Sequence, residues 1–360
     1  MRRFDVLDSF RGIAAIFIII HNIRFSDSIT ELTFFENGRI FVEMFFVLSG
    51  FVLTHGYAFK PLNFKSFFIS RTFRIFPLHL FMLLLVVASE IIKYIAYHYG
   101  VPFNHVPFTE GEAPSFLIYH LLLVQSWLPF VPSTGFNNPS WSISIEYYMY
   151  MIFFITLLFK QIDKIYLWIF ISAISFIFLI NDLGIYEVSR GLSSFFLGSL
   201  MYLLYKKSYT PLLSLSKNYF SIVEIVILVS IIYILSSDLY YKAIIATFIF
   251  SIQMFTFAFE KGIVSIFLKK SLFLYIGKLS YSIYLLHYFI LSIVMFISII
   301  LNKFGFESSL IIEGVRFIDF GNAIINNLVL FSIISLVIFL SKYTYKYIEL
   351  KWQKIGKKLL

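Results

Sequence analysis

The side chains best suited to chemistry are the few ionisable residues inside otherwise apolar segments. The first apolar segment, 6–24, carries Asp8, Arg11 and His21. An ionisable group at membrane depth costs about 2.5 kcal/mol or more, so each one is a functional hypothesis by default. His21 is suited to general-base catalysis near neutral pH, and a buried neutral histidine bonded to a neighbour is the equally weighted alternative. Asp8 and Arg11, spaced i and i+3, can pair on one helix face.

Two carboxylates are candidates to assist His21. Glu43 lies in the apolar run 38–58, and Glu146 lies in the run 140–159. A carboxylate beside a histidine orients the ring and stabilises the imidazolium, so we expect Glu43 or Glu146 to serve His21. Position alone leaves open that Glu43 only extends outward to the interface. Further candidates are Trp141, for which an interfacial aromatic belt is the alternative, Arg190 and His287.

Two arginines, Arg71 and Arg74, are spaced one helical turn apart between the second and third apolar runs. We expect them in a cytoplasmic loop together with Lys60 and Lys65. Basic residues in such loops commonly anchor a membrane protein. Two guanidinium groups on one face can also bind phosphate oxygens bidentately, so this pair is a candidate phosphate site.

Composition indicates that membrane helices position these residues. Of the 360 residues, 59% are hydrophobic and 14% are charged, whereas soluble domains contain about 25% charged residues. The net charge of +9 comes from basic residues in short loops, so it reports membrane orientation and does not predict nucleic-acid binding. The absence of cysteine excludes disulfides, thiolate catalysis and thiolate-bound metal, and no metal site is predicted.

A spanning helix needs about 20 mostly apolar residues, and ten such segments are predicted. They lie near 6–24, 38–58, 75–98, 140–159, 165–181, 189–205, 219–237, 239–259, 272–301 and 321–341. With the N-terminus inside, 21 of the 29 basic residues fall on the cytoplasmic side. We therefore expect an all-α integral membrane bundle of about ten transmembrane helices, both termini cytoplasmic, in a multi-pass protein of the plasma or inner membrane.

The predicted segment boundaries also indicate how deep each candidate residue lies in the membrane. The chain 1–360 reads as a single polytopic membrane domain without a fused soluble domain, and its longest loop, 99–139, is expected outside. Within that loop, 115–128 could form an interfacial or re-entrant helix. The boundaries put His21, Glu43, Glu146 and Arg190 in the middle-to-outer half of the membrane, with Arg71 and Arg74 at the inner face. This separation favours a phosphate-bearing donor from the cytoplasm and an acceptor presented further across the membrane.

Several stretches in this order resemble acyltransferase family 3, the membrane O-acyltransferases of envelope and extracellular glycans. They are LDSFRGIAAIFIIIH at 7–21, FVEMFFVLSGFVL at 41–53, FFISRTFRIFPLH at 67–79, NPSWSISIEYYMY at 138–150, RGLSSFFLGSLMYL at 190–203, LYIGKLSYSIYLLH at 274–287 and YKYIELKWQKIGKK at 345–358. The resemblance covers nearly the whole chain.

The resemblance implies residue roles and a donor. Arg11 and His21 correspond to the family's first-helix basic residue and histidine, Arg71 and Arg74 to its R-x-x-R motif, and Glu146 to the acid of W-S-x-S-x-E. Two departures are visible. Nine residues separate Arg11 from His21 where the family pattern has ten, and no proline follows Glu349, so Glu349 is not relied on. Acyl-CoA is the implied donor substrate, with no permanently bound cofactor.

The expected reaction is transfer of an acyl group, with acetyl expected, from acyl-CoA to a hydroxyl of a cell-envelope or exported saccharide. The acceptor would be a polymeric or lipid-linked glycan, His21 the base, and Arg71 and Arg74 the phosphate-binding residues. Membrane lipid surrounds the protein, and a separate acyl-transfer partner protein is an open possibility. The alternative is a transporter or flippase of a glycolipid or small acid, which would use buried charges as a relay. The two halves show no matching motifs, which disfavours many transporter folds.

Overall fold

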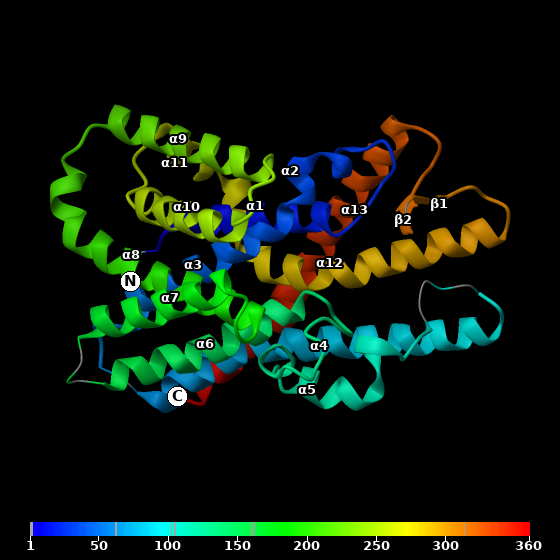
Figure 1. Cartoon of the computed structure of the whole chain (residues 1–360), viewed down its shortest axis with the longest axis horizontal. Coiled ribbons are helices and arrows are strands. Elements are labelled where there is room, and N and C mark those ends of the chain that lie inside the picture. The colour runs from blue at the N-terminus through cyan, green and yellow to red at the C-terminus, as the bar shows by residue number, and fades with distance from the viewer. Residues whose placement is uncertain are drawn as a thin grey trace.

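The computed structural model describes residues 3–61, 63–101, 103, 106–159, 161, 163–312 and 314–360, and helices dominate it. Each of the ten predicted segments coincides with a helix (Figure 1). These are α1 (Asp5–His21), α3 (Phe41–Tyr57), α4 (Phe64–His98), α6 (Ser140–Leu158), α7 (Lys164–Ile180), α8 (Tyr186–Leu213), α9 (Lys217–Leu235), α10 (Lys242–Phe257), α12 (Ser271–Lys303) and α13 (Ala323–Thr344).

Shorter elements connect these helices. The short helices are α2 (Thr33–Glu36), α5 (Leu117–Leu121), α11 (Ile263–Leu268) and α14 (Leu350–Lys358). Two strands, β1 (Ser309–Ile312) and β2 (Val315–Ile318), form an antiparallel hairpin in which Ser309 pairs with Ile318. Figure 1 shows this hairpin beside the end of α12, at the end of the molecule toward which α4 also extends.

Six helical stretches of the described chain are long and apolar enough to cross a membrane. They are Thr33–Tyr57, Phe64–His98, Ser140–Leu158, Lys217–Leu235, Ser271–Lys303 and Ala323–Lys358. The helices α7 and α10 are apolar but shorter, with 17 and 16 residues. A multi-pass helical membrane protein is therefore shown, and the ten spans and the orientation of the termini stay predictions.

Two expectations about loops are wrong. The helix α4 begins at Phe64, because the side chain of Asn63 accepts a hydrogen bond from the backbone N–H of Ser66 at 3.0 Å and caps the first turn. Arg71 and Arg74 are therefore helical. The stretch 115–128 does not form one helix, because it contains only part of a 3-10 turn at Pro114–Phe116, the five-residue α5 and a 3-10 turn at Gln125–Trp127.

Glycines allow the closest helix crossings. A Cβ atom at Gly50 of α3 would lie 1.9 Å from the carbonyl oxygen of Phe195, and one at Gly198 of α8 would lie 2.0 Å from that of Val47. The small pair Ser49-Gly50 thus lies at a close helix contact. Between α1 and α12, a Cβ at Gly12 would lie 2.6 Å from the backbone nitrogen of Gly277. Small residues let membrane helices approach this closely.

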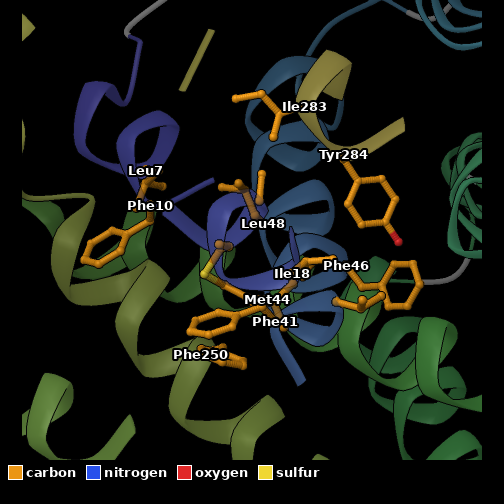
Figure 2. Packing of buried hydrophobic residues seen from close by; sticks show 14 of the residues in the cluster. Leu7, Phe10, Ile18, Phe41, Met44, Phe46, Leu48, Phe250, Ile283 and Tyr284 are labelled. Atoms are coloured by element: carbon orange, nitrogen blue, oxygen red, sulfur yellow. The ribbon is translucent and has the colours of Figure 1, made fainter. Parts of the chain in front are cut away.

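One continuous hydrophobic core lies around α1 and α3. Figure 2 shows side chains of α1, α3, α10 and α12 converging there, among them Phe10, Phe41, Met44 and Phe250. The rings of Phe10 and Phe257 meet edge to face with centroids 4.7 Å apart. This packing fixes α1 against α3 and α12, so the polar residues of α1 have a defined direction.

Candidate functional site

A cavity inside the helix bundle is rich in arginine. It measures about 330 Å³ and lies between α1, α3, α4, α6, α12 and the C-terminal helical segment. We call it the arginine cavity, because its basic lining residues are Arg3, Arg11, Arg71, Arg74 and Lys278. Glu146 and Glu349 are its lining carboxylates. Five cations facing two carboxylates can bind an anion with several phosphate groups.

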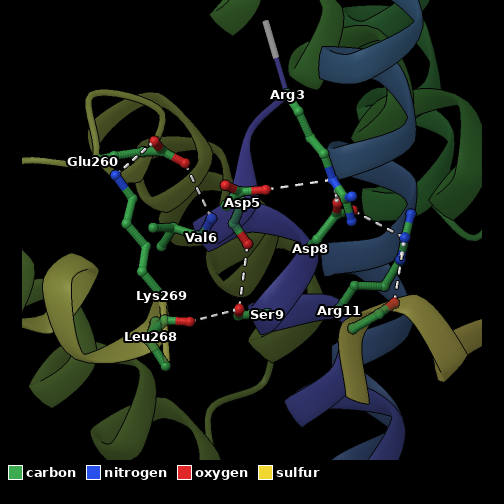
Figure 3. A network of polar contacts seen from close by, with 10 residues as sticks. Arg3, Asp5, Val6, Asp8, Ser9, Arg11, Glu260, Leu268 and Lys269 are labelled. Carbon is green, nitrogen blue, oxygen red and sulfur yellow. Dashed lines mark hydrogen bonds and ion pairs between the residues drawn. The ribbon is translucent and has the colours of Figure 1, made fainter. Parts of the chain in front are cut away.

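Arg11 is held in the arginine cavity by the predicted partner Asp8. Its Nη2 atom lies 2.9 Å from the Asp8 carboxylate, and its Nε atom donates to Ser280 Oγ at 2.8 Å. Arg3 donates to the other Asp8 oxygen at 2.7 Å (Figure 3). That hydrogen bond raises the pKa of the Arg3 guanidinium. The i, i+3 pairing of Asp8 and Arg11 is thus formed as predicted, and α12 supplies the additional contact through Ser280.

Arg71 and Arg74 differ in how they are held. The Nη2 atom of Arg71 donates to the Tyr57 hydroxyl at 3.0 Å, and its guanidinium also lies over the ring of Tyr150 at 5.7 Å. Arg74 lines the same cavity and makes no hydrogen bond or ion pair with the part of the chain that the structure describes. Arg71 and Arg74 lie one helical turn apart, and both guanidinium groups therefore have N–H donors that an anion can use.

Glu146 lies in the arginine cavity, which contradicts its predicted separation from Arg71 and Arg74. Its carboxylate accepts hydrogen bonds from Ser49 Oγ at 2.5 Å and from the Tyr150 hydroxyl. The separation was wrong because α4 begins before Arg71 and carries both arginines into the bundle. The cavity is thus common to the W-S-x-S-x-E and R-x-x-R motifs.

His21 lies at the end of α1 and lines a second, smaller cavity of about 160 Å³. We call this the His21 cavity; Arg39, Asn138 and Trp141 also line it. The Nδ1 atom of His21 is buried without a hydrogen-bond partner in the described structure. The His21 side chain thus lines this cavity, while its Nδ1 atom is buried.

The expected pairing of His21 with a carboxylate is not formed in the described structure. Glu43 is 1% exposed and pairs with Arg190 at 2.5 Å, and Arg190 is 4% exposed. The guanidinium of Arg190 lies 5.3 Å from the ring centroid of Trp141, on which Arg39 also packs at 5.4 Å. Glu43 is therefore buried in an ion pair between α3 and α8 and does not extend outward. Such a pair fixes helix register in some proteins.

His287 lies near His21 but is held differently. It is fully buried in α12, and its Nε2 atom lies 3.3 Å from the side-chain nitrogen of Asn22. Asn22 directly follows His21 and also lines the His21 cavity. The predicted candidate His287 thus contacts the cavity through Asn22, a residue that the sequence did not single out.

Two glutamates outside the candidate set have clear surroundings. Glu224 accepts hydrogen bonds from the backbone nitrogens of Gly262 and Ser265, both at 3.0 Å. This satisfied carboxylate joins α9 to α11, so its surroundings are those of a structural residue. Glu349 lines the arginine cavity and accepts from Ser282 Oγ. It lies at the end of a π-helical turn, Tyr345–Glu349, and such turns frequently occur at functional sites.

Comparison with known proteins matches residues 4–346 to the family described as acyltransferase domain, Acyl_transf_3. The chain belongs to the acyltransferase 3 family. Acyltransferase MdmB of Streptomyces mycarofaciens is 40% identical over 118 residues, 32% of this chain and 27% of that protein. Protein 2 in the picA locus of Rhizobium radiobacter is 31% identical over 160 residues, 40% of this chain and 77% of that protein. No solved structure matches.

In this member of the acyltransferase 3 family, the arginine cavity and the His21 cavity share two lining residues, Val42 and Tyr284. Both side chains are buried, and the Tyr284 hydroxyl lies 2.7 Å from Ser142 Oγ. Ser142 belongs to the family's W-S-x-S-x-E stretch, and Tyr284 lies three residues before His287. Val42 and Tyr284, which form the wall between the two cavities, were not predicted from the sequence, because uncharged residues in apolar helices do not stand out there. Only the position of Ser142 within the family motif pointed toward it.

Proposed function

We propose that this acyltransferase transfers an acyl group, expected to be acetyl, from acyl-CoA to a hydroxyl of a cell-envelope or exported saccharide. Family membership supports acyl transfer. The observation that carries the finer proposal is the arrangement of two cavities that share Val42 and Tyr284, one rich in arginine and one lined by His21. A donor with phosphates and a long arm fits the first cavity, and an acceptor hydroxyl fits the second.

The donor would bind through its phosphates. Coenzyme A carries a pyrophosphate and a ribose phosphate, and arginine binds such groups with charge-assisted, often bidentate hydrogen bonds. Arg71, Arg74 and Lys278 offer such donors in the arginine cavity. The pantetheine arm would run along Glu146 toward Val42 and Tyr284, which places the thioester at the wall of the His21 cavity.

The transfer step then needs a base. His21 would take the proton of the acceptor hydroxyl as its oxygen attacks the thioester carbonyl, and the imidazolium would return a proton to the departing thiolate. The carbon–sulfur bond of the thioester breaks and an oxygen ester forms, so this step requires no further reactant. The Arg39 guanidinium, which lines the same cavity, is placed to stabilise the oxyanion of the tetrahedral intermediate.

The membrane setting completes the proposal. Ten spans with cytoplasmic termini would open the arginine cavity to cytoplasmic acyl-CoA and place the His21 cavity further across the plasma or inner membrane. Residues 1–360 would act as one membrane domain, either alone or with a separate acyl-transfer partner.

Mass spectrometry of envelope and exported glycans tests this function. Cells with the intact protein should contain an acylated glycan that is absent from cells without it, and the mass difference identifies the acyl group. His21→Ala should lower transfer by about 10²–10⁴-fold, the range for loss of general acid–base catalysis. His98→Ala is the matched control, because His98 is exposed at the end of α4. Identical glycans in all strains at equal protein levels would refute the proposal.

A further inference from the structure

A third cavity lies next to the His21 cavity, and nothing in the reaction described above uses it. It measures about 300 Å³ and lies near the β1–β2 hairpin, with Asn22, Arg24, Lys93, Leu291, Met295 and Arg316 among its lining residues. We call it the hairpin cavity. Its walls come from the segment after α1, from α4, from α12 and from β2, so several elements build it.

Asn22 joins the hairpin cavity to the His21 cavity, because it lines both. Its side-chain nitrogen donates to the Ile18 carbonyl at 2.8 Å and lies 3.3 Å from Nε2 of His287. These contacts hold the amide beside His21, the residue next to it in the chain. A ligand in the hairpin cavity would therefore lie directly beside the proposed base.

Three cationic side chains line the hairpin cavity. Arg24, Lys93 and Arg316 line it, and no Asp or Glu of the described ranges does. Arg24 pairs with Glu36 at 3.0 Å, and Lys93 pairs with Glu90, but neither carboxylate lines the cavity. Cations that line a partly apolar cavity attract and hold an anionic group.

The other side of the cavity is apolar. Leu291, Met295 and Ile299 are spaced four residues apart on α12 and present one helix face to it. Methionine is flexible and adapts to ligands of irregular shape. The cavity thus combines an apolar helix face with a cationic rim, which matches a molecule that has both an alkyl part and an anionic part.

We propose that the hairpin cavity binds the acceptor, and that this acceptor is an anionic amphiphile: a saccharide joined to an alkyl chain through a phosphate or a comparable anionic group. The inference rests on the proposed function, because it takes His21 as the base. The alkyl part packs against the α12 face, and the anion binds Arg24 and Arg316. The saccharide then passes Asn22 and presents a hydroxyl to His21.

Cysteine protection tests the site, since the chain contains no cysteine. Ser292 lines the hairpin cavity, and Ser292→Cys in the full chain, reconstituted in phosphatidylcholine nanodiscs, should react with a maleimide. Decyl phosphate should protect this cysteine, whereas the neutral decyl glucoside should protect it much less. The matched control is Ser236→Cys, an exposed residue after α9 that does not line the cavity and should stay reactive.

Charge variants identify the anion-binding residues. Arg316→Gln or Arg24→Gln should raise the half-protecting concentration of decyl phosphate on the order of tenfold, as for loss of one charge-assisted hydrogen bond. Lys242→Gln, at the start of α10 and outside the cavity, is the matched control and should change nothing. Two variants at separate elements are used so that one unstable protein does not decide the result.

Three outcomes would overturn the inference. These are equal protection by both decyl compounds, equal protection by phosphatidylglycerol nanodiscs without added ligand, and unchanged protection in both arginine variants. The second would assign the cavity to bulk anionic lipid. Coenzyme A binding, measured in the same preparations, separates the two proposals. If coenzyme A binds and decyl phosphate does not, only this inference fails, whereas the reverse result removes the proposed donor.

Discussion

At the residue scale, Arg74 is the sharpest test of donor binding. It lines the arginine cavity and makes no hydrogen bond or ion pair within the described ranges, whereas Arg71 already contacts Tyr57. We expect Arg74→Gln to weaken coenzyme A binding about tenfold or more, because hydrogen bonds to charged groups contribute about 1.5–3 kcal/mol. Isothermal titration calorimetry on purified protein measures this change. Lys65→Gln, on the first turn of the same helix and outside the cavity, should bind normally; unchanged affinity in Arg74→Gln would reduce the arginine to a topology anchor.

The wall between the two cavities makes a second prediction at this scale. Val42 lines both cavities, so its size should limit the acyl group that reaches His21. We expect Val42→Ala to shift the preference from acetyl toward longer donors such as butyryl-CoA, with a change of about tenfold in the ratio of kcat/KM values. Val226→Ala, on the exposed face of α9, is the control. An unchanged donor ratio would place the thioester elsewhere.

At the scale of elements, glycines allow the close crossing of α3 and α8. A Cβ at Gly198 would lie 2.0 Å from a backbone oxygen of α3, which cannot move as a flexible side chain does. Gly198→Ala should therefore separate α3 from α8 and destabilise the protein by about 1–3 kcal/mol. Thermal unfolding in detergent, followed by tryptophan fluorescence, measures this. Gly56→Ala is matched, because no atom lies within 4 Å of its added Cβ; equal melting temperatures for both variants would contradict the crossing.

At the scale of the whole molecule, the donor route requires a defined orientation. The termini, the segment around Arg71 and Arg74, and the turn at Lys269-Lys270 should be cytoplasmic, with the loop 99–139 outside, because most basic residues lie on the first side. Single cysteines at Ser66, Ser115 and Ser271 can be introduced without background. An impermeant maleimide applied to spheroplasts should label only position 115. Labelling at 66 or 271 from outside would invert the topology and separate the arginine cavity from acyl-CoA.

The sequence alone determined the class of protein and the residue types that are available for catalysis and binding. Apolar runs long enough for helices must satisfy their backbone hydrogen bonds within each segment, so every predicted run could be placed by local pattern. The ion pair between Asp8 and Arg11 was also predictable, because a spacing of three residues places both side chains on one face of a helix. The order of the motifs identified the family. All of these depend on interactions within a few residues along the chain.

Only the tertiary structure decided which motifs share a cavity. Glu146 lies with Arg71 and Arg74 because a cap at Asn63 starts α4 early, so that α4 carries both arginines into the bundle. Glu43 meets Arg190, 147 positions away, and so leaves His21 without a carboxylate. The wall at Val42 and Tyr284 and the junction at Asn22 likewise arise from contacts between helices distant in sequence. Helix rotation and crossing depend on side-chain packing across the bundle, which no local pattern in one sequence contains.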